Sequence, residues 1–174
     1  MSELQVLLVA GTHGNEINAP WLLDQWKLQP TLIDTHALKV KTVIGNPLAK
    51  VIGKRYVDRD LNRSFCANFL SSSSFDAYEI KRAQELINLH GPEGTSPCQI
   101  AVDFHSTTSD MGACVVVYGR RPLDLAIASL IQFKMGLPIY LHEDDDSQQG
   151  FLVESWPCGL VVEIGPVSQG LLDQ

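Results

Sequence analysis

Short apolar segments that stop abruptly are the feature that most constrains how this chain of 174 residues folds. Leu4–Ala10 is a continuous apolar run that ends at a glycine, which is typical of a strand buried on both faces of a parallel sheet. Further short strands are predicted at Leu38–Gly45, Ile100–Phe104, Ala113–Tyr118, Ile139–Leu141 and Leu160–Ile164. Such a sheet needs cover on both faces, so the intervening segments must supply helices.

Helical patterns do lie between these strands. The predicted helices span about Glu16–Trp26, Asp76–Leu89 and Pro122–Met135. Pro20 in the first helix requires a late start or a kink, and Asp76 with Glu79 is predicted to form a capping box that opens the second. The charge-dense residues 54–65 are predicted to form a loop. The alternation predicts one α/β domain over residues 1–174, with three layers and a mostly parallel, mixed sheet between helices.

Composition excludes several classes of partner. The formal net charge of -7 argues against a nucleic-acid partner. No apolar run approaches the roughly 20 residues that a membrane span needs, so no membrane association is expected. The first ten residues enter a strand pattern without a basic region, so we expect no signal peptide and a cytoplasmic location. The acidic stretch Glu143–Asp146 is predicted to be an exposed loop.

Polar side chains suited to a metal follow two of the predicted strands. His13 and Glu16 lie three residues apart in the turn after the first strand, and His105 follows the strand that ends at Phe104. Open α/β sheets hold their chemistry at the carboxyl ends of strands, so we expect these side chains to meet. Two imidazoles and one carboxylate leave a fourth position open, as in a catalytic zinc site. Glu163 ends a late strand and is predicted to be the base that uses the metal.

Each signal has a plainer explanation when taken alone. A single His-x-x-Glu more often reflects a helix cap or a packed ring, and a metal-free fold whose histidines only pack stays open. The combination of three strand ends favours the metal. Asp103, two residues before His105, is expected on the same strand face, where it either orients that ligand or caps the strand end. The remaining histidines, His36, His90 and His142, are assigned no role.

With these residues in place, the chain resembles the aspartoacylase and succinylglutamate desuccinylase family of zinc carboxypeptidase-like enzymes, most closely the aspartoacylase branch. The likeness extends nearly from end to end through the blocks GTHGNE, NP, RYVDRDLNRSF, EIKRAQELINLHGP, DFHSTTSDMG and VEIGPVSQG. The resemblance implies a zinc carboxypeptidase-like fold and one zinc ion per chain. It also implies hydrolysis of the linear amide bond of an N-acyl amino acid, with N-acyl-L-aspartate as the leading substrate.

The resemblance further implies a role for each matching residue. The zinc ligands would be His13, Glu16 and His105, the general base Glu163, the oxyanion-stabilising residue Arg55, and the substrate-carboxylate residues Asn62 and Arg63 together with Arg55. The chemistry agrees, because a carboxylate can take a proton from activated water and a guanidinium stays charged. A bidentate arginine also suits a carboxylate substrate. The competing explanation for these arginines is a solvated loop in which they pair with Asp58 and Asp60.

Two departures from the family pattern limit these expectations. Aspartoacylase-type members continue into a smaller β-rich C-terminal domain that narrows the entrance to the site and contributes a tyrosine to it, whereas this chain ends at Gln174. We therefore expect a truncated chain or a catalytic domain that stands alone, with uncovered apolar surface that favours a homodimer. Aspartoacylases also carry an arginine shortly before the catalytic glutamate, but Gln148–Pro157 contains neither arginine nor lysine.

Three further functions stay open at this point. The second departure weakens the preference for aspartate, so succinylglutamate desuccinylase and deacylation of an aromatic N-acyl amino acid are the nearest alternatives. A zinc-binding domain that is inactive without its second domain is the alternative from another class.

Overall fold

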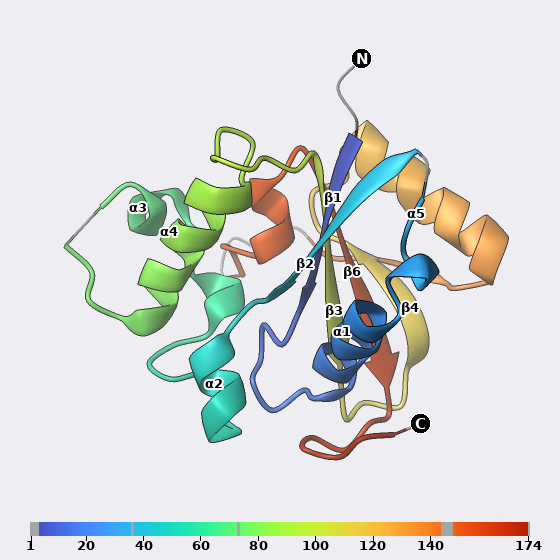
Figure 1. Cartoon of the computed structure of the whole chain (residues 1–174), viewed down its shortest axis with the longest axis horizontal. Helices are drawn as coiled ribbons and strands as arrows, with labels where there is room; N and C mark the ends of the chain where they lie inside the picture. Colours follow the sequence, from blue (N-terminus) through green and yellow to red (C-terminus); the bar gives the residue numbers. More distant parts are fainter. Residues whose placement is uncertain (1–3, 36, 73, 144–147, 174) are drawn as a thin grey trace.

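A six-stranded mixed sheet forms the centre of the protein (Figure 1). The computed structural model describes residues 4–35, 37–72, 74–143 and 148–173. Within them the strands are β1 (Leu4–Ala10), β2 (Leu38–Ile44), β3 (Ile100–Ser106), β4 (Gly112–Val117), β5 (Ile139–Leu141) and β6 (Cys158–Gly165), in the order β2-β1-β3-β6-β4-β5. The first four in that order run parallel, and the pair β4 and β5 runs the other way because β4 is antiparallel to β6. The carboxyl ends of β1, β3 and β6 consequently share one edge.

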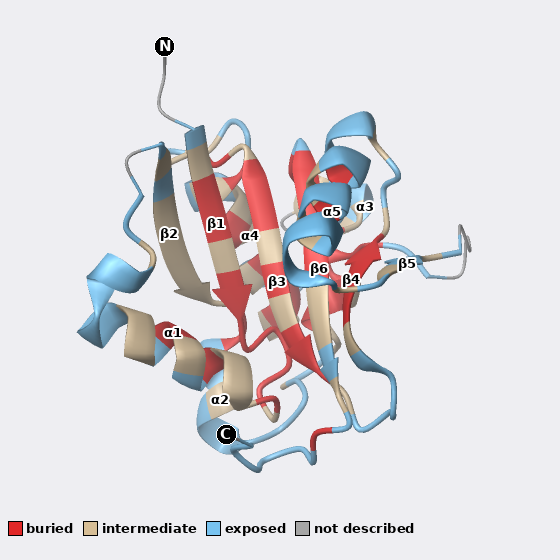
Figure 2. Cartoon of the chain, turned by 90° about the vertical axis from the view of Figure 1, so that its right-hand side faces the viewer, coloured by how far each residue is buried: buried red, intermediate tan, exposed pale blue. Residues whose placement is uncertain are grey.

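Helices cover both faces of this sheet. On one face lie α1 (Asn18–Leu28) and α5 (Pro122–Met135), and on the other lie α3 (Ala67–Leu70) and α4 (Tyr78–His90), as Figures 1 and 2 show. The remaining elements are α2 (Pro47–Ile52) and three short 3₁₀ helices, η1 (Pro30–Leu32), η2 (Leu61–Arg63) and η3 (Leu152–Ser155). The predicted three-layer α/β architecture is confirmed.

Side chains that alternate along the strands pack into hydrophobic cores on the two faces of the sheet. Leu7 and Val9 on β1 pack with Ala83 and Leu86 of α4, in a cluster that also holds Trp156. Val6, one residue before Leu7, packs in a separate cluster against which Ile127 of α5 lies. Figure 2 shows β1 and β3 buried over much of their length, while α1 and α5 turn exposed faces outward. Apolar burial of this kind, on the order of 25 cal/mol per Å², is the main stabilising term.

Most predicted boundaries hold to within two residues, and two differences bear on the site. The strand predicted to end at Phe104 continues to Ser106, which places His105 inside β3. The first helix begins at Asn18, later than predicted, so that Pro20 falls in its first turn, where a missing N–H costs little. The loop predicted at 54–65 contains the short helix η2 near its end.

The predicted capping box at Asp76 and Glu79 is wrong. The N-cap residue of α4 is Ala77, and Asp76 pairs with Lys81 at the surface. The N-terminal N–H of α4, on Tyr78, instead donates to Asp58 Oδ2 at 2.7 Å. A carboxylate supplied by a distant loop thus replaces the local cap.

Helix α2 is not anticipated by the apolar pattern because it has only six residues. Its signal is the pair Asn46-Pro47, in which the Asn46 side chain accepts the Ala49 N–H as an N-cap and the proline occupies the first helical position. The acidic loop predicted around Glu143–Asp146 lies, beyond its first residue, outside the described residues, as does His36. Among the described residues, no helix is long and apolar enough to cross a membrane.

Candidate metal centre

Side chains from three strand ends converge on one cavity of about 280 Å³. His13 and Glu16 come from the turn after β1, His105 from the last part of β3, and Glu163 from β6. The parallel register of β3 and β6 places His105 directly beside Glu163. The topology therefore brings together the four residues that the sequence singles out.

The turn after β1 is held against α2 by a close approach of backbones. A side chain on Gly14 would place its Cβ 2.1 Å from the carbonyl carbon of Ala49, a distance no real contact allows. The N–H of Gly14 donates to the backbone oxygen of Arg55 at 3.1 Å. A glycine between His13 and Glu16 thus lets the turn that carries these two residues lie beside α2 and the loop after it. This turn is called the metal turn below.

His13, Glu16 and His105 form a buried cluster with their ligand atoms within 4.8 Å of one another. The Nδ1 atoms of His13 and His105 lie 2.6 Å and 3.1 Å from the two oxygens of Glu16. These separations suit ligands that each lie about 2 Å from one ion. Two nitrogens and a carboxylate oxygen form the donor set of a catalytic zinc site with an open position, so the residues fit zinc.

A second carboxylate supports each imidazole from its outer edge. His13 Nε2 lies 3.1 Å from Asp60 Oδ1, and His105 Nε2 lies 2.7 Å from Asp103 Oδ2. Asp103, fully buried, also accepts a hydrogen bond from the Thr12 hydroxyl at 2.8 Å. The contact expected between Asp103 and His105 is present. Such partners fix the ring orientation and raise the basicity of a metal ligand.

The ionisation of the cluster reflects these contacts. Burial on its own would raise the pKa of Glu16, but hydrogen bonds from His105 and His13 hold it well below its usual range. Burial would lower the pKa of His105, whereas the charges and hydrogen bonds of Asp103 and Glu16 raise it well above its ordinary value. The Glu16 carboxylate is therefore charged at neutral pH, which favours a cation beside it.

Glu163 differs from Glu16 because, in the described part of the chain, its neighbours affect it through burial and charge rather than through hydrogen bonds. Burial raises its pKa, the nearby Glu16 and Asp103 raise it further, and His105 and His13 only partly offset this. A carboxyl group that is half-buried and whose pKa is raised is suited to accepting and returning a proton.

The three candidate substrate-binding residues line the same cavity. Arg55 lies in the loop after α2, where Nη2 is 3.1 Å from Asp60 Oδ2 and Nη1 is 3.8 Å from Glu16 Oε1. Asn62 and Arg63 belong to η2. The pairing of Arg55 with Asp60 predicted by the solvated-loop explanation is thus present, but it occurs at the edge of the cavity.

Asn62 and Arg63 are both tied to the segment before β6. Asn62 Oδ1 accepts the N–H of Leu152 at 2.8 Å, and the Arg63 guanidinium lies over the ring of Phe151 at 4.1 Å from its centre. Arg63 Nη1 also donates to the backbone oxygen of Asn62 at 2.8 Å. The side chain of Arg63 is thereby held at the cavity wall, with its charge available to an anion.

Sequence reasoning missed two features of the cavity. One is the contact between Asp60 and His13, whose members lie far apart in sequence. The other is a group of rings in the wall, in which Tyr118 lies 3.9 Å from Phe151 and 4.7 Å from His142 between ring centres. The alternation of Cys114, Val116 and Tyr118 along the fourth strand gives a signal for the tyrosine alone.

Nearly the whole chain matches one family of known proteins. The family model described as "Succinylglutamate desuccinylase/Aspartoacylase catalytic domain" matches residues 2–174. A protein of Prochlorococcus marinus named "Probable aspartoacylase" is 69% identical over 172 residues, which are 99% of this chain and 56% of that protein. The chain thus spans little more than half the length of this relative.

Solved structures show the same architecture. Murine aminoacylase 3 superposes with a TM-score of 0.84 and 31% identity, over 99% of this chain and 59% of the murine chain. The succinylglutamate desuccinylase from Chromobacterium violaceum superposes with a TM-score of 0.72 over 97% of this chain and 55% of that one. At 20% identity, this second likeness concerns the fold alone.

Proposed function

The chain belongs to the succinylglutamate desuccinylase/aspartoacylase family, and from that membership we propose that it is the catalytic part of a zinc-dependent amidohydrolase acting on N-acyl amino acids. The observation that carries the proposal is the meeting of His13, Glu16 and His105 with Glu163 around one cavity. Three ligands with an open position and a nearby base are the requirements of metal-assisted hydrolysis.

The residues of the cavity divide the work of hydrolysis between them. A bound zinc ion would supply Lewis-acid activation of the attacking water. Glu163 accepts a proton from that water and returns it to the nitrogen of the leaving amine. Arg55 stabilises the negative charge that develops on the amide oxygen, since its guanidinium stays protonated throughout.

The carboxylate of the substrate is assigned to Asn62 and Arg63 together with Arg55. Arg63 supports this role because its guanidinium is fixed against Phe151 and keeps its charge at the wall of the cavity. A planar guanidinium matches a carboxylate through two parallel hydrogen bonds. The leading substrate is N-acyl-L-aspartate, which would yield a carboxylate and L-aspartate, in line with the name of the Prochlorococcus relative.

An aromatic N-acyl amino acid is the second candidate substrate. Rings of Tyr118, His142 and Phe151 lie against one another in the cavity wall and offer faces on which a flat side chain stacks. The segment Gln148–Pro157 supplies no cation for a second carboxylate. These observations support an aromatic N-acyl amino acid as the alternative to N-acyl-L-aspartate.

Zinc content and turnover, measured on the same preparation, test the proposal. We expect one equivalent of zinc and hydrolysis of N-acetyl-L-aspartate, with N-succinyl-L-glutamate and N-acetyl-L-phenylalanine as the competing substrates. Preference for the phenylalanine derivative would establish the second candidate, and preference for the glutamate derivative would establish a desuccinylase. One equivalent of zinc without hydrolysis of any of them would instead indicate a metal-binding domain that needs further chain for activity. A chain that binds no zinc would support the metal-free alternative.

Two finer expectations complete the proposal. A homodimer is favoured by the outward face of α5, where Leu130, Phe133 and Met135 are 56%, 80% and 68% exposed. Sedimentation at increasing concentration tests this, and a clean monomer at high concentration would contradict it. A cytoplasmic location is proposed as well, and cell fractionation checks it.

A further inference from the structure

Glu79 is a fully buried carboxylate that lies outside the cavity and has an unusual set of partners. Its Oε1 accepts from the N–H of Val57 at 2.6 Å and from the Asn46 side chain at 3.0 Å. Its Oε2 accepts from the N–H groups of Asp58 and Arg59 at 3.0 Å and 3.1 Å. Four neutral donors thus surround a side chain with 0% exposure.

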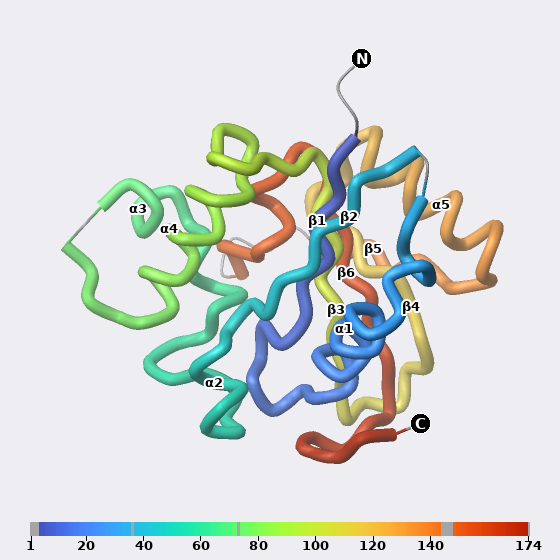
Figure 3. The backbone as a smooth tube through the Cα atoms, in the orientation of Figure 1, coloured from blue at the N-terminus to red at the C-terminus, as the bar shows by residue number. Residues whose placement is uncertain are grey.

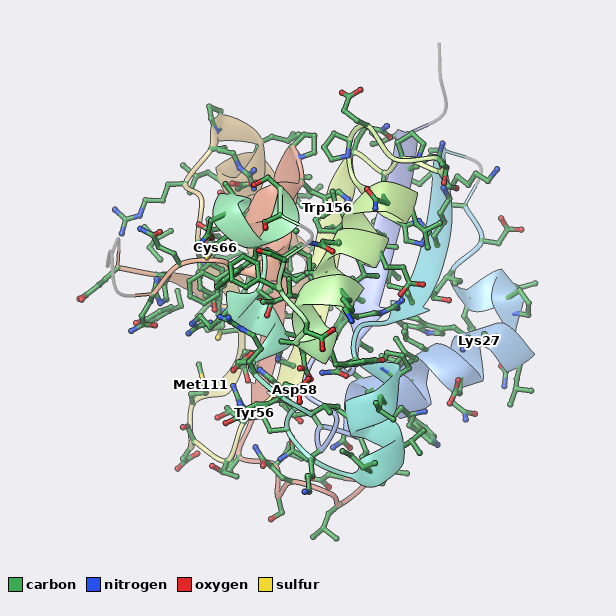
Figure 4. All side chains as sticks on the ribbon, turned by 90° about the vertical axis from the view of Figure 1, so that its left-hand side faces the viewer. Lys27, Tyr56, Asp58, Cys66, Met111 and Trp156 are labelled. Atoms are coloured by element: carbon green, nitrogen blue, oxygen red, sulfur yellow. The ribbon has the colours of Figure 1, made fainter. Side chains whose placement is uncertain are left out.

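The loop also accepts a hydrogen bond from the helix that carries Glu79. Asp58 Oδ2 accepts the N–H of Tyr78, the first residue of α4, at 2.7 Å. Figure 4 shows Asp58 beside this end of α4, and Figure 3 shows the chain running from α2 through this loop and on towards α3. Residues 57–59 and the first turn of α4 therefore hold each other through four hydrogen bonds, three of them to Glu79.

This loop is the segment that carries the proposed substrate-binding residues. Arg55 stands two residues before the anchored stretch, and Asn62 and Arg63 follow shortly after it. The fourth donor to Glu79, Asn46, is the N-cap of α2, the helix against which the metal turn packs. Glu79 therefore contacts both the start of α2 and the loop that follows this helix.

A negative charge suits this place better than a neutral side chain would. Burial on its own would raise the pKa of Glu79, but the hydrogen bonds from Val57, Asn46, Asp58 and Arg59 lower it below its ordinary value. The N-terminal end of α4 adds a favourable dipole. An amide in its place would direct an NH₂ group at two backbone or side-chain donors and leave them unpaired.

We propose that Glu79 is a positioning residue for catalysis, which fixes the backbone of residues 57–59 so that Asn62 and Arg63 present themselves to the substrate carboxylate. The assignment deepens the proposed function and rests on it for the identity of the substrate. Arg55 keeps anchors of its own in Asp60 and the N–H of Gly14. Loss of Glu79 should therefore weaken substrate binding more than it slows the chemical step.

The test compares Glu79→Gln with Glu85→Gln, the same change on the same helix at a side chain that is 56% exposed and pairs with Arg82. For Glu79→Gln we expect amide hydrogen exchange at residues 57–59 to accelerate at least about tenfold, the effect of one lost charge-assisted hydrogen bond. KM for N-acetyl-L-aspartate should rise by a similar factor and exceed the fall in kcat, with zinc content unchanged. Glu85→Gln should match the wild type in all three measurements.

A shorter carboxylate keeps the test decisive if the glutamine variant fails to fold. Glu79→Asp retains the charge but reaches fewer of the four donors, so its exchange rates and KM should lie between those of wild type and Glu79→Gln. A folded Glu79 variant with unchanged exchange at 57–59 and unchanged KM would overturn the assignment. A lower melting temperature alone, with both of these unchanged, would reduce Glu79 to a structural role.

Failure of the proposed function gives a different result. A wild-type chain that neither hydrolyses nor binds the substrate refutes the activity, whereas the exchange rates of Glu79→Gln still decide whether this carboxylate holds the loop.

Discussion

Asp60 Oδ1 lies 3.1 Å from Nε2 of His13, on the edge of the imidazole opposite the nitrogen that contacts Glu16. The second oxygen of the same carboxylate accepts from Arg55 at 3.1 Å. One side chain thus connects His13, a proposed metal ligand, to Arg55, the residue proposed to stabilise the oxyanion. Burial would raise the pKa of Asp60, but His13 and Arg55 hold it well below its usual range, so it is charged at neutral pH.

Asp60→Asn should weaken zinc binding about 10–100-fold, as loss of an outer carboxylate partner does at other zinc–histidine sites. The amide can no longer accept from both His13 and Arg55, so turnover should fall too. Competition with a chelator of known affinity measures the affinity of each variant for zinc. Asp58→Asn serves as the control, because Asp58 lies in the same loop and caps α4 without contacting the ligands. Equal zinc affinity in Asp60→Asn and wild type would contradict the prediction.

Glu163→Gln should keep its zinc and lose at least about 100-fold in kcat, the lower range for removal of a general base. The amide has nearly the same shape but cannot take a proton. Metal analysis and steady-state kinetics on one sample separate the two effects. Full activity in this variant would show that Glu163 is not the base.

His105→Ala should lose zinc, since one of three ligands disappears. His90→Ala is the matched control, because His90 ends α4 and its imidazole lies against the backbone oxygen of Ser96, away from the metal cluster. Metal content after purification without chelator is the measurement. Full occupancy in His105→Ala would remove His105 from the ligand set.

Asp124→Asn should lower the free energy of unfolding by about 2–4 kcal/mol at neutral pH. Asp124 is fully buried and joins α5 to β6 by accepting from Arg121 Nε at 2.7 Å and from the N–H of Gly159 at 2.9 Å. Burial would raise its pKa, but these donors lower the pKa below its ordinary value. The stabilisation is therefore present above about pH 4 and disappears as the pH falls through the folded-state pKa.

Urea unfolding at several pH values checks the Asp124 prediction, and the gap between variant and wild type should narrow below pH 4. Asp24→Asn provides the control, since Asp24 is half exposed and pairs with Lys27 at the surface, where such a pair contributes roughly 0–1 kcal/mol. If the difference in free energy of unfolding between variant and wild type stayed constant from pH 7 to pH 3, the charge of Asp124 would not be the source of the stabilisation.

The sequence predicts local features well and long-range contacts poorly. Leu4–Ala10 and Pro122–Met135 are found with the predicted bounds because an apolar run closed by glycine and a helix opened by proline are local signals. The metal cluster is predictable too, since strand ends in such a sheet meet at one edge. The capping of α4 is not, because Asp58 competes with the nearer Asp76 only once the loop is folded. The contact between Asp60 and His13 could not be predicted from the sequence for the same reason.

The absence of a side chain at Gly14 limits how this site could be transferred to another protein. Its missing side chain is what allows the metal turn to lie against the bare backbone of Ala49 and Lys50, so even a methyl group would wedge the two segments apart. A saturation library at position 14, selected for metal binding, should return glycine alone. The transplantable unit is accordingly larger than His-x-x-Glu: it includes the short helix alongside the turn, and a scaffold without that neighbour gains the ligands but not their spacing.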